Sequence, residues 1–205
     1  VTVKEILDEA AAGLSERFRD RPRVEVRIRR TIGDTYWGLG RTEEAYEQFN
    51  RALEIQRREF GEKDPQTLQT MRDVSLLLKV RGRFAEAESM MLATCEAYKD
   101  VLGPENQSTL ESMNNLAGLY EESGRYAEAE SLFLATLEVR RRLLGENHPS
   151  ALRLLLGLGN LYAGQARYEE AEERYNEFLE MWPQANGLES PDEDTRMFGA
   201  RIGLA

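Results

Sequence analysis

The sequence has 205 residues, of which 31% are charged and 41% are hydrophobic, a balance typical of a soluble globular chain. Its net charge of −10 disfavours nucleic acid as a partner, and no apolar run is long enough to cross a membrane. Because no secretory signal is visible and a single Cys cannot form an internal disulfide, we expect a cytoplasmic protein.

Residues 1–23 are expected to form an N-terminal capping helix and a linker. The helix, over residues 2–18, begins with a capping box in which Thr2 and Glu5 satisfy each other's backbone N–H groups. Its apolar side chains share one face: Ile6, Leu7, Ala10 and Leu14. An Arg-rich stretch follows, with seven Arg and two acidic residues between positions 17 and 30. Because the acidic remainder of the chain would repel phosphates, we interpret this stretch as a solvated helix face and loop.

A 42-residue period begins after this segment. The run GRFAEAE at 82–88 returns as GRYAEAE at 124–130, and weaker copies start at Gly40 and Ala166. Two further markers keep the same spacing: Gly at 61, 103 and 145, and Pro at 65, 149 and 191. We therefore predict four units over 24–183, followed by a linker and a partial fifth unit over 184–205. The four units span 24–65, 66–107, 108–149 and 150–183.

Each unit is predicted to contain two helices separated by a turn. Apolar residues recur at i, i+3, i+6, i+7 and i+10 before each turn, which is the stripe of an α-helix rather than the alternation of a strand. The i+7 position is always small, and a large residue recurs in the second helix, so we expect each small site to face a large one. The small residues are Gly33, Ser75, Ala117 and Gly159, and the large ones are Phe49, Met91, Phe133 and Tyr175.

The run NNLAGLYEESGRYAEAESLF at 114–133 resembles a tetratricopeptide repeat. The 42-residue period and the connection LGENHPSAL at 144–152 resemble the longer repeats of kinesin light chains. This resemblance implies an all-α fold, a right-handed superhelical solenoid of antiparallel helix pairs, with a concave side lined by the first helix of each pair. The Arg-rich segment also resembles the junction between bacterial serine/threonine kinases and their repeat arrays.

No catalytic constellation is evident in the sequence. The only histidine, His148, occupies the same repeat position as Asn106 and Asp64, which favours a role in starting a helix. Cys95 occupies a position that is Leu in the other units and is predicted to be a core residue. We therefore predict no enzyme activity, no cofactor and no metal site.

The resemblance implies that four positions of each first helix face the groove. These are Arg27, Arg30, Thr31 and Asp34; Gln69, Arg72, Asp73 and Leu76; Glu111, Asn114, Asn115 and Gly118; and Arg153, Leu156, Gly157 and Asn160. Of these, Asn115 alone matches the Asn with which family members hold a peptide backbone. Arg27, Arg30 and Arg72 are candidates to receive an acidic segment or a terminal carboxylate. The alternative is that they pair with Asp34, Asp73 and neighbouring glutamates.

The predicted function is a protein–protein interaction scaffold that binds a peptide or protein segment, as a regulatory arm of a larger signalling protein. The alternative is a structural module that self-associates through the ends of the solenoid. Its half-covered fifth first helix, expected over 193–204, would be the contact. Light scattering across a concentration series separates the two functions.

Overall fold

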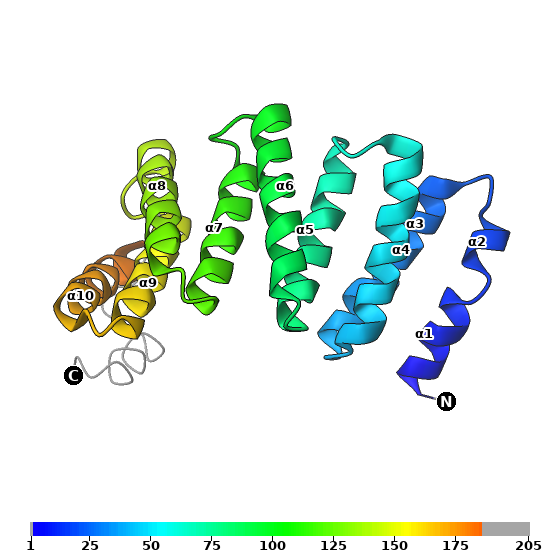
Figure 1. Cartoon of the computed structure of the whole chain (residues 1–205), viewed down its shortest axis with the longest axis horizontal. Helices are drawn as coiled ribbons and strands as arrows, with labels where there is room; N and C mark the ends of the chain where they lie inside the picture. The colour runs from blue at the N-terminus through cyan, green and yellow to red at the C-terminus, as the bar shows by residue number, and fades with distance from the viewer. Residues whose placement is uncertain (1, 186–205) are drawn as a thin grey trace. The chain divides into compact units, whose positions relative to one another are not determined.

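The computed structural model describes residues 2–185, and over that range the chain is helical, without strands (Figure 1). The helices are α1 (Val3–Ala11), α2 (Leu14–Arg17), α3 (Pro22–Gly38), α4 (Thr42–Phe60), α5 (Pro65–Val80), α6 (Phe84–Leu102), α7 (Gln107–Glu122), α8 (Tyr126–Leu144), α9 (Pro149–Gly164) and α10 (Tyr168–Ala185). The predicted all-α fold class is confirmed. The expected fifth first helix, with Met197, Phe198, Ile202 and Leu204 on its apolar side, lies outside the described residues.

The chain consists of two compact units, Val1–Ser112 and Met113–Ala205, and the boundary between them falls within α7. In the first unit, α3 packs on α4, α4 on α5 and α5 on α6. In the second unit, α8 packs on α9 and α9 on α10. First and second helices therefore alternate along each unit, and α4 and α8 each also contact the first helix of the pair that follows.

Left-handed residues end the first helices, as the repeated glycines predict. The backbone φ is +70° at Gly40, +72° at Gly82 and +73° at Gly124. This conformation is open to Gly because it has no Cβ to clash with the preceding turn. The fourth pair adopts the same turn with Ala166 at φ +58°, where a Cβ adds strain.

The predicted contact between small and large residues is confirmed in two pairs. A Cβ built on Gly33 would lie 2.9 Å from the Phe49 ring, and one built on Gly159 would lie 2.3 Å from the Tyr175 ring. Carbon atoms in van der Waals contact are separated by about 3.5–4.0 Å, so neither site has room for a side chain. The absence of a Cβ therefore sets how closely the two helices approach in these two pairs, α3 with α4 and α9 with α10.

The N-terminal segment departs from the single helix predicted over 2–18. The capping box between Thr2 and Glu5 is confirmed. The chain then leaves the helix at Gly13, which has φ +70°, so α1 and α2 are separate helices. The expectation of one continuous apolar face is wrong because Leu14 is buried in α2, whereas α1 buries none of its residues.

A buried polar network joins α2 to the first helix pair. Arg29 is 2% exposed and Glu25 is 5% exposed, and the Arg29 Nε donates to Glu25 Oε1 at 2.9 Å. The same guanidinium donates to Gln48 on α4 and to the Ser15 hydroxyl on α2, and Ser15 in turn donates to Glu25 at 2.7 Å. All three guanidinium nitrogens of Arg29 and Oε1 of Glu25 thus have partners, and hydrogen bonds of this kind are the condition under which a buried ion pair is tolerated.

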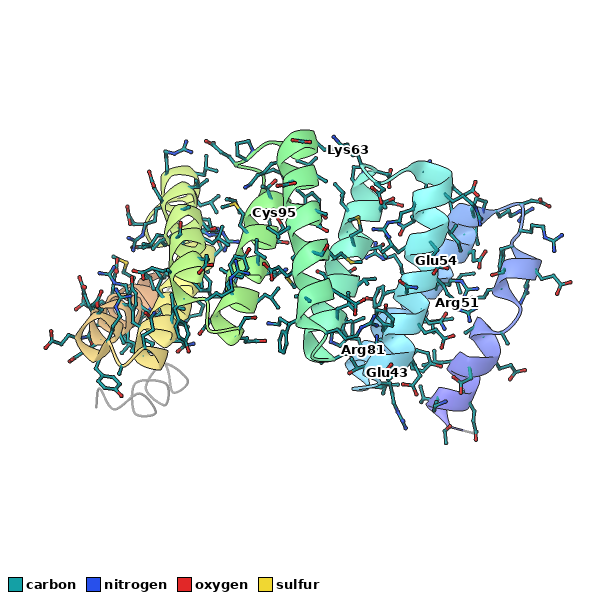
Figure 2. The ribbon with its side chains drawn as sticks, viewed as in Figure 1. Glu43, Arg51, Glu54, Lys63, Arg81 and Cys95 are labelled. Carbon is teal, nitrogen blue, oxygen red and sulfur yellow. The ribbon has the colours of Figure 1, made fainter. Side chains whose placement is uncertain are left out.

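Arginines also join neighbouring pairs at the repeated turns. Arg167 lies 4.2 Å from the centre of the Tyr162 ring and donates to both Glu130 on α8 and Glu170 on α10. Tyr162 donates its hydroxyl to the same Glu130 at 2.9 Å. In the first unit, Arg81 at the end of α5 makes a forked pair with Glu43 on α4, where Figure 2 shows the two side chains together. These contacts reinforce the packing of helices that belong to adjacent repeats.

Candidate functional site: the first helices

The candidate groove residues of the first unit form ion pairs from one first helix to the next. Arg30 on α3 donates to Gln69 Oε1 at 3.2 Å and to Asp73 Oδ2 at 2.9 Å, both on α5. Arg72 on α5 donates to Glu111 Oε2 on α7 at 2.7 Å. Two of the three arginines proposed as anion receptors are therefore already paired within the chain.

Asp73 lies at the centre of this series of ion pairs. Burial raises the pKa of its carboxyl above the usual range, and the neighbouring guanidinium groups of Arg30 and Arg72 partly oppose that effect. The Arg72 Nε lies 3.8 Å from Asp73 Oδ1. The carboxylate thus lies within ion-pair distance of two arginines at a half-buried position, and Arg72 has Glu111 as a second acidic partner.

A cavity of about 460 Å³ lies beside these ion pairs, between the N-terminal halves of α3 and α5. Its lining residues are Arg23, Val24, Val26, Arg27, Arg30, Thr31, Asp34, Gln66 and Gln69. Arg27 is exposed, and among residues 2–185 its guanidinium has no ion-pair partner. Arg23 lies over the Phe60 ring, 4.9 Å from its centre.

Four of the lining residues, Arg23, Val24, Val26 and Gln66, were not predicted from the sequence. The prediction carried over four positions of each first helix, and these residues lie before the first of those positions in α3 and α5. Arg23 could have been predicted from its spacing of four residues from Arg27, which places both side chains on one face of a helix. The structure brings Arg27, Arg30, Asp34 and Gln69 together at this cavity.

The second unit presents mostly neutral residues at the corresponding positions, and Arg153 is the charged one among them. Asn114 and Asn115 on α7 are half-buried, and no other described side chain is recorded as their hydrogen-bond partner. Gly118, one turn further along α7, has open space where a Cβ would stand. On α9, Arg153 is exposed, while Asn160 accepts a hydrogen bond of 2.8 Å from the Tyr175 hydroxyl. Asn160 therefore has a structural partner, whereas the amides of Asn114 and Asn115 have no side-chain partner within residues 2–185.

Gly157, another of the predicted groove residues, packs against the neighbouring helix α8. A Cβ built there would lie 3.3 Å from the ring of Phe133 on α8. The residue is half-buried against that helix, so a small side chain is needed for the approach of α8 and α9.

A second hollow, of about 1210 Å³, lies between α2 and α4. Its α4 wall carries glutamates, arginines and an asparagine, some of which bond to one another. Glu47 accepts from Arg51 at 2.9 Å, and Glu54 accepts from Asn50 at 3.0 Å. Figure 2 shows Arg51 and Glu54 on α4. Because its charges are of both signs, this hollow favours no ligand of one sign.

The residues considered for catalysis have structural positions. His148 caps α9, where its Nδ1 accepts from the Ser150 backbone N–H at 3.2 Å. Cys95 is buried in α6, as predicted (Figure 2). No group of three or more potential metal ligands lies together within residues 2–185. Within the same residues, no helix combines the length and the apolar character needed to cross a bilayer.

Solved structures share this fold at low sequence identity. BtubC (BKLC) from P. vanneervenii has a TM-score of 0.74 and 20% identity, with 84% of this chain and 68% of that chain covered. A putative kinesin light chain from Podosopora anserina has a TM-score of 0.78 and 21% identity, with 89% of this chain and 86% of that chain covered. The apo form of RapI has a TM-score of 0.69 and 20% identity, with 86% of this chain and 60% of that chain covered. The predicted likeness to kinesin light chain repeats is thus confirmed at the level of the fold.

Sequence comparison gives the family directly. A search of curated proteins finds no match to this chain. The tetratricopeptide repeat family, in contrast, matches over residues 25–100, 75–137 and 108–184, which together span most of the sequence. The chain belongs to the tetratricopeptide repeat family.

Proposed function

We propose that this chain is a cytoplasmic protein–protein interaction scaffold that binds a peptide or protein segment along its first helices. In this proposal it serves as a regulatory arm of a larger signalling protein, such as a serine/threonine kinase. The observation that carries the proposal is the cavity between α3 and α5, with Arg27 at its wall, whose guanidinium has no ion-pair partner in the part of the chain that the structure describes.

The polar residues of the second unit also support this function. Half-buried amides without partners lose part of their hydration in the free protein, and a peptide backbone can restore both a donor and an acceptor. Asn114 and Asn115 lie on consecutive positions of α7, one turn before the open site at Gly118. A bound chain could approach the α7 backbone closely there, because no side chain intervenes.

One structural neighbour gives further support. A Rap protein solved in complex with Competence and Sporulation Factor has a TM-score of 0.68 with this chain and 15% identity, covering 87% of this chain and 46% of that chain. The fold of this chain is therefore compatible with the binding of a second molecule.

An immobilised library of random peptides, probed with the full chain, tests the proposal. We expect a set of peptides to be retained, and we expect Asn115→Ala or Arg27→Ala to release a subset of them. Arg51→Ala is the matched control, because Arg51 is exposed on α4 and its recorded partner is Glu47. If no peptide is retained, or if the control releases the same peptides, binding along the first helices is refuted.

Self-association is a second candidate function, and it rests on α1. This helix buries none of its residues, and its apolar Val3 and Ile6 are each 55% exposed. A second copy covering this face would raise the molar mass measured by light scattering as concentration increases, and Ile6→Lys would abolish the rise. A mass that stays constant with concentration refutes this alternative.

A further inference from the structure

We infer that α1 is a hinged cap, which swings away from α3 about Gly13 while α2 and the helix pairs stay folded. In its closed position the cap fills the place where a second helix packs on the first helix of the next pair, so no other helix can pack there. The inference follows from the partner that holds α1, from how little of α1 is buried, and from the backbone at the turn between α1 and α2.

The closed position of α1 is that of a preceding second helix. In the second unit, α8 packs on α9, and Tyr162 on α9 donates its hydroxyl to Glu130 on α8 at 2.9 Å. Tyr36 occupies the same repeat position on α3. There α1 packs on α3, and Tyr36 donates its hydroxyl to Asp8 on α1 at 2.6 Å. A short helix with a carboxylate of its own thus takes the place of the helix that the repeat supplies elsewhere.

Little surface holds α1 in this place. Five residues of α8 are buried, whereas none of α1 is. The α1 residues Leu7 and Ala11 are half-buried, and Lys4 Nζ lies 4.0 Å from Glu44 Oε1 on α4. Elements with few buried apolar contacts open locally at a small fraction of the free energy of global unfolding. We therefore expect α1 to open far more often than the helix pairs unfold.

The turn between α1 and α2 is built to change direction. Gly13 has φ +70°, and a Cβ built on it has no neighbouring atom within 4 Å, so the residue is free to adopt other conformations. A cavity of about 440 Å³ lies beneath the turn, with Ala12 and Gly13 on one side and Gln48 and Arg51 of α4 on the other. Rotation at Gly13 therefore disturbs no close packing between the turn and α4.

The chain is fixed again directly after this hinge. Leu14 is 4% exposed, and the Ser15 hydroxyl donates to Glu25 and accepts from Arg29, both on α3. These contacts belong to α2, so they hold α2 on α3 whether α1 is closed or open. The moving part therefore ends at Gly13.

Asp8 has partners on both sides of the contact. Tyr36 donates to its Oδ1, while Lys4 on α1 itself donates to its Oδ2 at 2.6 Å. When α1 leaves, Asp8 keeps Lys4, and water can replace Asp8 at the Tyr36 hydroxyl. Opening therefore leaves no buried charge without a partner, and the bond between Tyr36 and Asp8 acts as the latch.

Native-state hydrogen exchange of the full chain, followed by NMR at several urea concentrations below the unfolding midpoint, tests the inference. The protein is kept at a concentration where light scattering gives the mass of a monomer. We expect the amides of residues 6–12 to have protection factors at least about 100-fold below those of α3 and nearly independent of urea, because opening exposes little surface. The amides of Arg17 and Phe18, which bond within α2, should be about tenfold better protected than those of α1.

Variants separate the latch from the fold of the first pair. Tyr36→Phe should raise the exchange of the α1 amides about tenfold, since the closed state loses one hydrogen bond. Adding Tyr36→Phe to Asp8→Ala should raise it no further, because the two residues act through one bond. Phe49→Leu removes packing between α3 and α4, so it should raise the exchange of the α3 amides at least about fivefold and leave that of α1 unchanged.

Four results would overturn the inference. Equal protection and equal urea dependence in α1 and α3 would show that α1 opens only when the pair unfolds. Phe49→Leu would show the same if it raised exchange equally in both helices. A gain of about tenfold from Tyr36→Phe in the Asp8→Ala background would mean that the two residues form no latch. Amides of Arg17 and Phe18 as poorly protected as those of α1 would place the hinge after α2 rather than at Gly13.

Discussion

Two mid-helix glycines of the second unit should respond in opposite directions to the same substitution. Gly159 on α9 faces the Tyr175 ring, and an added Cβ would lie 2.3, 2.6 and 2.9 Å from three of its atoms. Gly118 on α7 has nothing within 4 Å of the same position. Gly159→Ala should therefore destabilise the protein, whereas Gly118→Ala should stabilise it.

The magnitudes follow from two opposing effects. Replacing Gly by Ala inside a helix gains about 1 kcal/mol of backbone preference, and this gain applies at both positions. At Gly159 the added methyl overpacks the contact, which costs about 1–3 kcal/mol. The upper end applies because Tyr175 is buried and its hydroxyl is held by Asn160 at 2.8 Å, so the ring cannot swing away. We expect a net loss of about 2 kcal/mol at Gly159 and a gain of about 1 kcal/mol at Gly118.

Urea denaturation followed by circular dichroism measures both effects. With a slope of about 2 kcal/mol per molar urea, the midpoint should fall by about 1 M for Gly159→Ala and rise by about 0.5 M for Gly118→Ala. Adding Tyr175→Met to Gly159→Ala should recover part of the loss, since Met91 occupies this repeat position in the second pair. Midpoint shifts of the same sign in the two single variants would refute the packing argument.

Three further predictions concern other contacts. Arg29→Ala should lower the free energy of unfolding by about 3–5 kcal/mol, because it leaves Glu25 charged and buried, and a loss below about 1 kcal/mol in urea denaturation would contradict this. Burial, together with the hydrogen bond to Glu130, raises the pKa of Tyr162 from 10.0 to about 12. Its stabilising contribution should persist below pH 10 and be lost between pH 10 and about 12, in step with the ultraviolet absorbance of tyrosinate, and tyrosines that all ionise near pH 10 would refute it. Ala166→Gly should raise the thermal midpoint by the equivalent of about 1 kcal/mol, because Gly adopts a positive φ without strain. Gly124→Ala should lower the midpoint by a similar amount for the same reason. Equal midpoints in the two variants would contradict the assignment of strain to Ala166.

The repeat pattern was sufficient to predict the helices and the core. Residues repeated every 42 positions meet the same neighbours in every unit, so a small residue such as Gly33 can be matched with Phe49 from spacing alone. Buried Cys95 followed from the leucines at the same repeat position. Such residues have short or rigid side chains, and the backbone therefore determines what they touch.

The parts that the sequence did not predict involve long side chains and chain breaks. Arg30 could reach Asp34 on its own helix, Asp73 on the next one or a ligand, and the spacing does not distinguish these partners; the structure pairs it with Asp73. The break at Gly13 was missed because the apolar pattern of the N-terminal segment continues across it. Neither feature recurs in every unit, so comparison between units gave no information about them.

The small-to-large contacts have a consequence for how such a chain can grow. Gly33 meets Phe49, and Gly159 meets Tyr175, entirely within one helix pair. A duplication of 42 residues carries both halves of such a contact with it, so the new copy is packed internally from the start. What must adapt are the contacts that join one pair to the next, which include arginines and glutamates and also packing such as that of Gly157 against Phe133. An array of this kind can gain or lose copies by recombination, while its binding residues diverge separately in each copy.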